Sequence, residues 1–132
     1  VRAAIAAAGL DDRIEAPGSM PRADAWAGAD LALLPSLVES FGMVVTEALA
    51  RGVPAVVSEG GAAEALGAAA SGARPGAVVP TGDAAALADT MRRWLTDTGY
   101  REQLRTAALA RRATLERWEV TARRVREALT RR

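Results

Sequence analysis

Two glutamates, Glu39 and Glu47, bracket a short segment whose residue types could bind an anionic ligand. The segment reads Glu-Ser-Phe-Gly-Met-Val-Val-Thr-Glu and follows an apolar run of strand length, residues 31–35. A helix that begins after a strand leaves unpaired backbone N–H groups, which form an anion site beside the strand's carboxyl end. Glu39 would lie in the loop, and Glu47 about one and a half turns into the helix. This pattern indicates a ligand that carries a phosphate with hydroxyl groups on either side, as a nucleotide sugar does.

The composition limits the chemistry that this chain can perform. Its 132 residues, 50% hydrophobic and 25% charged, suffice for one globular domain with a core. Neither cysteine nor histidine occurs, which excludes disulfides, thiolate metal sites and the commonest general base. We therefore expect any acid–base chemistry to use carboxylates, arginines such as Arg51, or the single tyrosine, Tyr100. No run of residues approaches the roughly 18 apolar residues of a membrane span.

Charge is divided unevenly along the chain. Residues 1–91 contain five arginines and eleven acidic residues, whereas residues 92–132 contain twelve arginines and five acidic residues. A basic segment can bind nucleic acid or an anionic membrane. The alternative, which we favour, is a pair of solvated helices that dock on an acidic body.

Apolar runs alternate with turn residues over the first two-thirds of the chain. Four runs predict short strands: residues 13–17, 31–35, 53–57 and 77–80. Helices are predicted before and between them: residues 1–8, 21–29 (with Trp26 as its anchor), 41–51 and 62–70. Strands that alternate with helices favour a parallel sheet with right-handed crossovers. About four strands are fewer than the six of a complete doubly wound sheet, so we expect a partial Rossmann-like α/β domain.

From Asp83 onward the pattern is helical. Asp83 is a good N-cap, and three apolar stripes follow it at helical spacing. The stripes are Leu87, Met91, Trp94 and Leu95; Tyr100, Leu104, Ala107, Arg111 and Leu115; and Trp118, Ala122, Val125 and Leu129. We expect the aromatic residues of these stripes to lie in the core.

Several of these motifs, in this order and spacing, resemble the donor-binding half of the retaining glycosyltransferases of family 4. The matching segments are Ala29–Ser36, Glu39–Gly42, Glu47–Pro54, Gly60–Glu64 and Pro80–Asp83, with Leu87 and Trp118. Enzymes of this family consist of two Rossmann-like domains with the active site between them, the GT-B fold. The resemblance runs from about Val1 to Leu129. It implies that residues 1–132 are a C-terminal donor-binding domain, with the N-terminal acceptor domain and the first part of this domain missing.

The resemblance implies a role for each matching position in the transfer of a hexose-like sugar with retention of configuration. Glu39 would be the catalytic residue beside the donor sugar, and Glu47 would accept hydrogen bonds from the ribose. Backbone amides between them would hold the sugar hydroxyls and the diphosphate: Ser40, Phe41, Gly42, Met43 and Val44. Gly18, Ser19 and Met20 would lie near the base. A carboxylate can accept from two neighbouring hydroxyls, and a glycine lets the backbone approach a pyrophosphate closely.

The resemblance also implies which partners the chain has. The nucleotide sugar, with UDP or GDP, would be a substrate, and we expect neither a cofactor nor a metal ion. The acceptor, a sugar, a lipid or a small molecule, would bind through the N-terminal domain. Members of the family have an upstream glycine-rich turn with an arginine and a lysine, but this chain has no lysine and no such turn. We therefore expect this chain alone to bind nucleotide weakly and to have no turnover. We also expect a cytoplasmic protein that can lie at the inner face of the membrane.

The same residues allow other interpretations. Ser36 and Glu39 fit a capping box, Glu47 could be a solvated helix residue, and Glu64 either a ligand contact or a first-turn acid. One alternative function is that of a related GT-B enzyme, such as a nucleotide-sugar epimerase or a glycosyl phosphorylase. The other is a non-catalytic, arginine-rich module that binds nucleic acid or membrane through residues 92–132, with an affinity that falls as salt rises.

Overall fold

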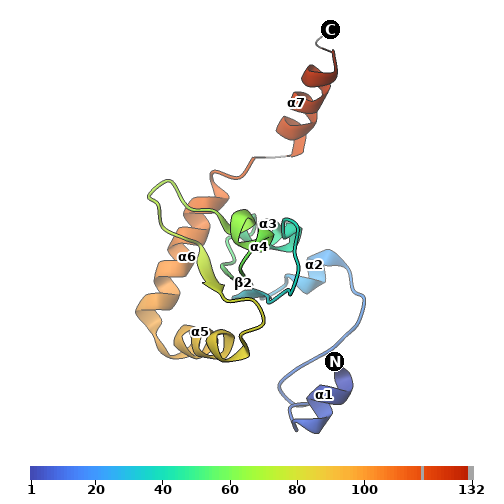
Figure 1. Cartoon of the computed structure of the whole chain (residues 1–132), viewed down its shortest axis with the longest axis vertical. Helices are drawn as coiled ribbons and strands as arrows, with labels where there is room; N and C mark the ends of the chain where they lie inside the picture. The colour runs from blue at the N-terminus through green and yellow to red at the C-terminus, as the bar shows by residue number, and fades with distance from the viewer. Residues whose placement is uncertain (117, 131–132) are drawn as a thin grey trace.

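A parallel sheet of three strands forms the centre of the structure (Figure 1). The computed structural model describes residues 1–116 and 118–130. The strands are β1 (Ala32–Leu34), β2 (Ala55–Ser58) and β3 (Gly76–Val79), in the order β1-β2-β3. Leu33 pairs with Val56, and Val57 with Val78. All four residues of β2 are buried, as expected of the middle strand of a parallel sheet. The predicted α/β class and parallel sheet are thus confirmed.

The predicted strand over residues 13–17 is wrong, so the described residues form three strands and not four. The segment consists of turns and irregular backbone, and its apolar residue Ile14 is 45% exposed. The guanidinium of Arg2 donates two hydrogen bonds to the carbonyl of Ala16, at 2.9 and 3.1 Å. A short run that ends at Pro17 and Gly18 is a weak strand signal, because strand propensity depends on a neighbouring strand against which to pack.

Helices cover the two faces of the sheet and extend beyond it. They are α1 (Arg2–Ala7), α2 (Arg22–Ala25), α3 (Met43–Leu49), α4 (Gly61–Leu66), α5 (Ala84–Thr96), α6 (Thr98–Arg112) and α7 (Trp118–Thr130). Alternate residues of a strand point to opposite faces of its sheet. Ala55 and Val57 of β2 belong to the core with α3 and α4, whereas Ser58 shares a pocket with Leu87 of α5. Helices α3 and α4 therefore lie on one face, and α5 lies on the other.

Helices α2, α3 and α4 are each shorter than the sequence predicts. Helix α3 begins at Met43 because Gly42, its N-cap, has a left-handed backbone with a φ of 74°. Helix α4 ends at Gly67, whose φ of 57° lies in the region that favours glycine. Trp26 packs against the core at the end of α2, as predicted for the anchor of this helix.

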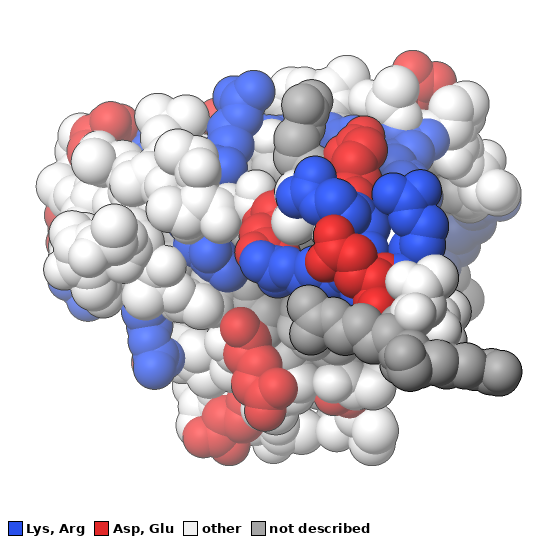
Figure 2. Space-filling model, turned by 90° about the horizontal axis from the view of Figure 1, so that it is seen from above, with Lys and Arg blue, Asp and Glu red and all other residues white. Residues whose placement is uncertain are grey.

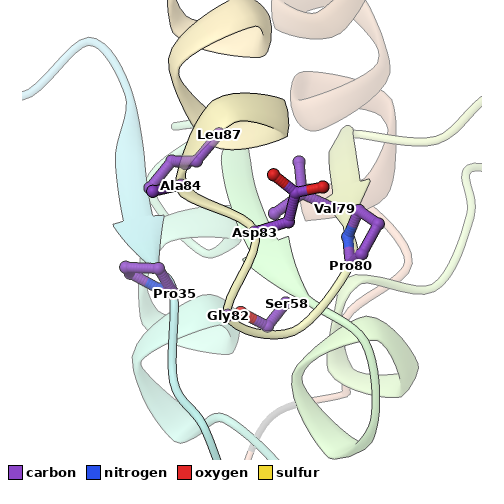
Figure 3. Close-up of a pocket in the computed structure, with 8 residues that line it drawn as sticks. All are labelled: Pro35, Ser58, Val79, Pro80, Gly82, Asp83, Ala84 and Leu87. Atoms are coloured by element: carbon purple, nitrogen blue, oxygen red, sulfur yellow. The ribbon is translucent and has the colours of Figure 1, made fainter.

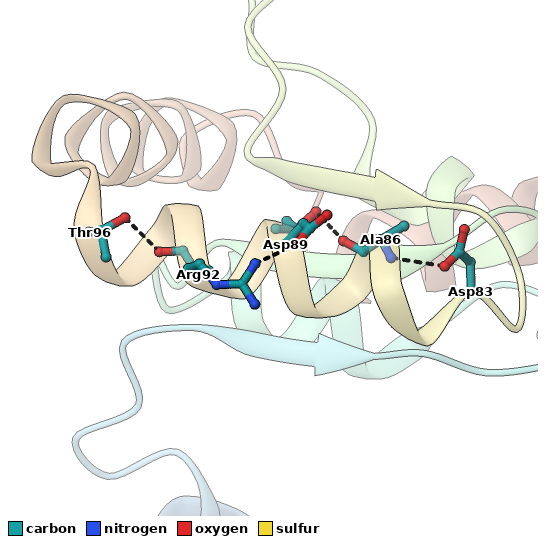
Figure 4. Close-up of polar contacts among 6 residues, drawn as sticks. Asp83, Ala86, Asp89, Arg92 and Thr96 are labelled. Atoms are coloured by element: carbon teal, nitrogen blue, oxygen red, sulfur yellow. Dashed lines mark hydrogen bonds and ion pairs between the residues drawn. The ribbon is translucent and has the colours of Figure 1, made fainter.

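Helices α5 and α6 pack against each other and against β3. Asp83 caps α5 by accepting a hydrogen bond from the Ala86 amide at 2.9 Å, which confirms the predicted N-cap (Figure 4). Farther along α5, Asp89 pairs with Arg92, and the Thr96 hydroxyl donates to the Arg92 carbonyl at 2.9 Å (Figure 4). These contacts lie on the outer face of the helix, while Trp94 is buried. The first predicted stripe is wrong at its end, because Leu95 is 69% exposed.

Helix α7 projects away from the sheet and from the other helices (Figure 1). Its predicted stripe is present but not buried: Trp118, Val125 and Leu129 are 70%, 54% and 76% exposed. The expectation that Trp118 lies in the core is therefore wrong for the described part of the chain. Helical spacing shows which side chains share a face, but it does not place a surface opposite that face. None of the described helices is long and apolar enough to cross a membrane.

The start of α4 lies directly against the loop between β1 and α3. A Cβ atom on Gly61 would lie 2.2 Å from the carbonyl oxygen of Ser40 and 2.6 Å from that of Glu39. A Cβ atom on Gly42 would lie 3.1 Å from the Cα of Ala62. Two glycines thus allow the loop that contains Glu39 to approach α4 at backbone distance.

We predict that Gly61→Ala destabilises the chain, because its methyl group would overlap backbone atoms that side-chain rotation cannot move. The free energy of unfolding, measured by urea denaturation, should fall by about 1–3 kcal/mol or more. Gly99→Ala in α6 is the matched control, since its nearest contact is the Asp97 Oδ1 at 3.4 Å. A Gly61→Ala variant as stable as the parent would contradict this packing.

A second prediction concerns Asp97, which ends α5 and caps α6. The hydrogen bond from the Tyr100 amide, helped by Arg93, lowers the pKa of the Asp97 carboxyl from its ordinary value of 3.8. A lowered pKa means that the carboxylate stabilises the fold above pH 3.8 and that this contribution disappears as the pH falls through the lower, folded-state value.

Asp97→Asn keeps a capping side chain but removes the charge. The parent should therefore have a higher melting temperature than Asp97→Asn at neutral pH, and this difference in melting temperature should vanish in strong acid. Thermal melts across this pH range measure it. A difference that is independent of pH would refute the role of the charge.

Candidate functional site

Glu39 lies in the loop between β1 and α3, where its carboxylate is bound by backbone amides. Its Oε1 accepts hydrogen bonds from the amides of Gly42 at 3.0 Å and Phe41 at 3.4 Å. The capping-box interpretation is wrong in its details, because residues 37–39 are not helical. Glu39 instead closes the turn that leads into α3. Two of the amides expected to hold the ligand are therefore occupied by this carboxylate in the present conformation.

The remaining amides at the start of α3 are open. Val45 N donates to Gly42 O at 2.8 Å, which begins the hydrogen bonding of the helix. Within the described residues, the amides of Met43 and Val44 make no such bond, as is usual for the first turn of a helix. The side chains of Met43 and Val44 are 49% and 45% exposed, so solvent reaches this end of α3. The partial positive charge of the helix start thus faces outward.

Glu47 joins α3 to α2. Its Oε2 accepts a hydrogen bond from the Trp26 indole at 3.4 Å, and its Oε1 lies 3.5 Å from Arg22 Nη1. Arg51 lies over the Trp26 ring, 5.5 Å from its centroid, and donates to the Glu47 carbonyl at 3.0 Å. The Glu47 side chain is 23% exposed, so the carboxylate is fixed by neighbours but still accessible.

The position of Glu47 along α3 relates it to the open amides. Glu47 follows Met43 by four residues and Val44 by three. Residues at these separations lie on one face of a helix. The side chains of Met43, Val44 and Glu47 thus lie on one side of α3, and Glu39 lies in the loop before this helix. The convergence of both carboxylates on a common ligand stays a prediction.

Gly18, Ser19 and Met20 lie in the exposed, irregular segment just before α2. Gly18 has a φ of 83°, and Met20 is 43% exposed. Arg22, two residues after Met20, is the link between this segment and Glu47. This ion pair places α2, which follows the segment, beside Glu47, whereas Glu39 lies in the loop before α3.

A pocket that the sequence did not predict lies at the carboxyl ends of the three strands. Its volume is about 190 Å³, and it is lined by Pro35, Ser58, Val79, Pro80, Gly82, Asp83, Ala84 and Leu87 (Figure 3). Ser58 is the one buried polar residue of the described core, at 2% exposure. The signal was present in the sequence, because a single hydroxyl ends the otherwise apolar run Ala-Val-Val-Ser.

Arginines of the basic C-terminal segment, residues 92–132, pair with acidic side chains. Arg105 of α6 lies 2.6 Å from Asp30, just before β1, and thereby joins the basic segment to the acidic one. Arg124 lies 2.7 Å from Glu116. Figure 2 shows arginines and acidic residues interleaved on the face seen from above. The Arg105–Asp30 pair agrees with docking of α6 on the acidic segment, whereas α7 projects away from it (Figure 1) and Arg124 pairs within the basic segment.

Comparison with known proteins identifies the family. Residues 1–111 match the family described as Glycosyl transferases group 1. The chain is 37% identical over 112 residues to a D-inositol 3-phosphate glycosyltransferase of Nocardioides sp., and 36% identical over 117 residues to one of Kribbella flavida. These matches cover 84% and 86% of this chain but 24% and 27% of those relatives.

A solved structure gives the same answer for the fold. Sucrose-phosphate synthase from Thermosynechococcus elongatus matches 97% of this chain with a TM-score of 0.79 and 28% identity. This chain spans 32% of the synthase chain. The sheet, the helices around it and the family match agree with the resemblance seen in the sequence. The chain belongs to the group 1 glycosyltransferases and has the fold of a GT-B C-terminal domain.

Proposed function

We propose that this chain forms the donor-binding part of a retaining glycosyltransferase, which transfers a hexose-like sugar from a nucleotide sugar. The observation that carries the proposal is the open start of α3, with Glu39 in the loop that leads into it and Glu47 farther along the helix. Family membership supports sugar transfer in general. The names of the two relatives favour a phosphorylated polyol as the acceptor of the whole enzyme.

The diphosphate of the donor would bind at the start of α3. The Met43 and Val44 amides offer two donors there, and the helix dipole favours negative charge. Donors fixed in advance also stabilise the charge that develops on the departing diphosphate, and they need no reorganisation during the reaction. We propose that such donors, with basic residues of the whole enzyme, do the work for which other transferases use a metal ion.

Glu47 would hold the ribose of the nucleotide. Contacts with Trp26 at 3.4 Å and Arg22 at 3.5 Å orient its carboxylate, and each of its oxygens has a second lone pair that can accept from a further donor. Fixing the carboxylate before binding reduces the entropy lost when the nucleotide is ordered.

Glu39 would lie beside the donor sugar. Its Oε1 is bound to the Gly42 and Phe41 amides, and its Oε2 makes no hydrogen bond within the described residues. The free oxygen can accept from sugar hydroxyls, while the bound one keeps the side chain in place. Catalysis by this segment would then depend on positioning and charge stabilisation rather than on a strong base.

We predict that Glu47→Ala weakens nucleotide binding by about tenfold, because the variant loses an acceptor for two ribose hydroxyls. Calorimetry with UDP, GDP and ADP would measure this and identify the base. Glu127→Ala in α7 is a matched control that removes a glutamate far from α3. An affinity that falls steeply with salt and is indifferent to Glu47→Ala would instead support the arginine-rich module.

We predict a different result for Glu39→Ala. Removing this carboxylate frees the Phe41 and Gly42 amides, so the bare nucleotide diphosphate should bind at least as tightly as it binds to the parent. The additional affinity for the matching nucleotide sugar should be lost. Glu39→Gln keeps an acceptor oxygen for the amides and separates this effect from a change in the loop. Parallel loss of both affinities would argue that Glu39 serves only to shape the turn.

A further inference from the structure

The pocket at the carboxyl edge of the sheet is built from all three strand ends. Pro35 follows β1, Ser58 ends β2, and Val79 ends β3 and is followed by Pro80, while Ala84 and Leu87 come from the first turns of α5 (Figure 3). Ser58 and Val79 are buried at 2% and 4% exposure, whereas Pro35, Pro80 and Ala84 are exposed. The pocket therefore has a buried floor and an open rim. A water molecule needs about 10–15 Å³, so a volume of about 190 Å³ admits a ligand of several heavy atoms.

The floor of this pocket contains a hydroxyl with no partner. The Oγ of Ser58 is buried and makes no hydrogen bond within the described residues. Figure 3 shows the Ser58 side chain next to the turn at Gly82. Buried hydroxyls are nearly always hydrogen-bonded, because an unpaired one loses its hydration without compensation. A ligand or an ordered water with a polar group at the floor would supply the missing partner.

The other polar groups of the pocket define the charge of a suitable ligand. The Asp83 carboxylate lies at the rim, and its Oδ1 already accepts from the Ala86 amide at the start of α5. None of the lining residues is cationic, so an anion would meet a carboxylate with no compensating charge. No group of three metal-binding side chains occurs among the described residues, and one carboxylate is a poor site for a divalent cation.

We propose that this pocket binds a neutral, hydroxyl-bearing group of the size of a monosaccharide. Ser58 would donate to, or accept from, one sugar hydroxyl, and the Oδ2 of Asp83, which makes no hydrogen bond within the described residues, would accept from another. The apolar walls formed by Pro35, Val79 and Leu87 would pack against the C–H faces of the ring. The inference rests on the proposed function only in the choice of a sugar as the hydroxylated ligand.

The position of the pocket relates it to the candidate donor site. Pro35 begins the same loop that carries Glu39. Leu37 of this loop lies against the turn at Gly82, where an added Cβ atom would be 3.9 Å from the Leu37 Cδ2. The loop between β1 and α3 thus borders both sites.

The test is an NMR titration of the isotope-labelled 132-residue chain with D-glucose and, separately, with inorganic phosphate. We expect glucose to shift the amide signals of Ser58, Gly82 and Ala84 in a saturable manner at millimolar concentration, and phosphate to leave them unchanged. Ser58→Ala should weaken glucose binding about fivefold or more, the effect of losing one buried hydrogen bond. Ser71→Ala, which removes the same group from an exposed loop, should leave it intact.

Stability separates a lost ligand contact from a damaged fold. Ser58→Ala removes an unpaired buried hydroxyl, so its thermal midpoint should equal or exceed that of the parent. Equal glucose shifts in Ser58→Ala and the parent, the absence of saturation, or shifts caused by phosphate instead of glucose would overturn the proposal. Evidence that the pocket holds only an ordered water molecule, and no glucose, would also overturn the proposal.

Two further arms distinguish the source of the sugar and protect the test from the fate of the donor proposal. If UDP-glucose shifts the Ser58 amide signal more than UDP does, the pocket binds the donor sugar. If UDP-glucose and UDP give equal shifts while free glucose still binds, the pocket binds a separate sugar. Glu47→Ala should require about tenfold more UDP for the same shifts on α3 and should preserve the glucose shifts at the pocket. Loss of either response alone refutes only the corresponding proposal.

Discussion

The close approach of α4 to the loop between β1 and α3 is the constraint on which the rest of the site depends. Gly61 allows it, since any side chain there would overlap the carbonyls of Ser40 and Glu39. The loop cannot move outward without leaving α4, and it cannot move inward past the backbone. This contact fixes the start of α3 and, with it, the amides that hold the Glu39 carboxylate. Because this helix start is held rigidly, its N–H groups are already ordered, and little conformational entropy is lost when a ligand binds to them.

The buried middle strand extends this constraint across the sheet. All four residues of β2 are enclosed, and the core around Leu49 and Leu66 packs one face of the sheet against α3 and α4. Large side chains without exposure leave little freedom for the strand ends to shift independently. Both sites at the carboxyl edge, the start of α3 and the pocket at Ser58, therefore have a common rigid support. The two sites differ in the side chains that their loops contribute: Glu39 at the start of α3 and Asp83 at the pocket.

Ion pairs and stacked arginines play a lesser part. Arg105 joins α6 to Asp30, and Arg51 stacks on Trp26 beside Glu47. Such partly exposed contacts each contribute little to stability. Their effect is to orient the helices. The Arg105–Asp30 pair holds α6 against the core, and the stacking of Arg51 on Trp26 holds the end of α2 beside the Glu47 carboxylate. The uneven charge of the sequence is thus partly used inside the chain.

The sequence alone determined the α/β class, the parallel strands at residues 31–35, 53–57 and 77–80, and the helix that carries Glu47. These are local properties, since apolar runs, glycine punctuation and helical spacing act within a few residues. The predicted strand at residues 13–17 is absent, because a strand forms only beside another strand. The apolar stripe of α7 is exposed and not buried, because burial requires a second surface that packs against it. Only the tertiary structure decided that Glu39 binds the amides of its own turn and that Glu47 is held by α2. It also decided that the Ser58 hydroxyl, unpaired within the described residues, lies in one pocket with Asp83 and Leu87. Such pairings join residues from separate elements, and their distances follow from packing between elements, which residue spacing does not contain.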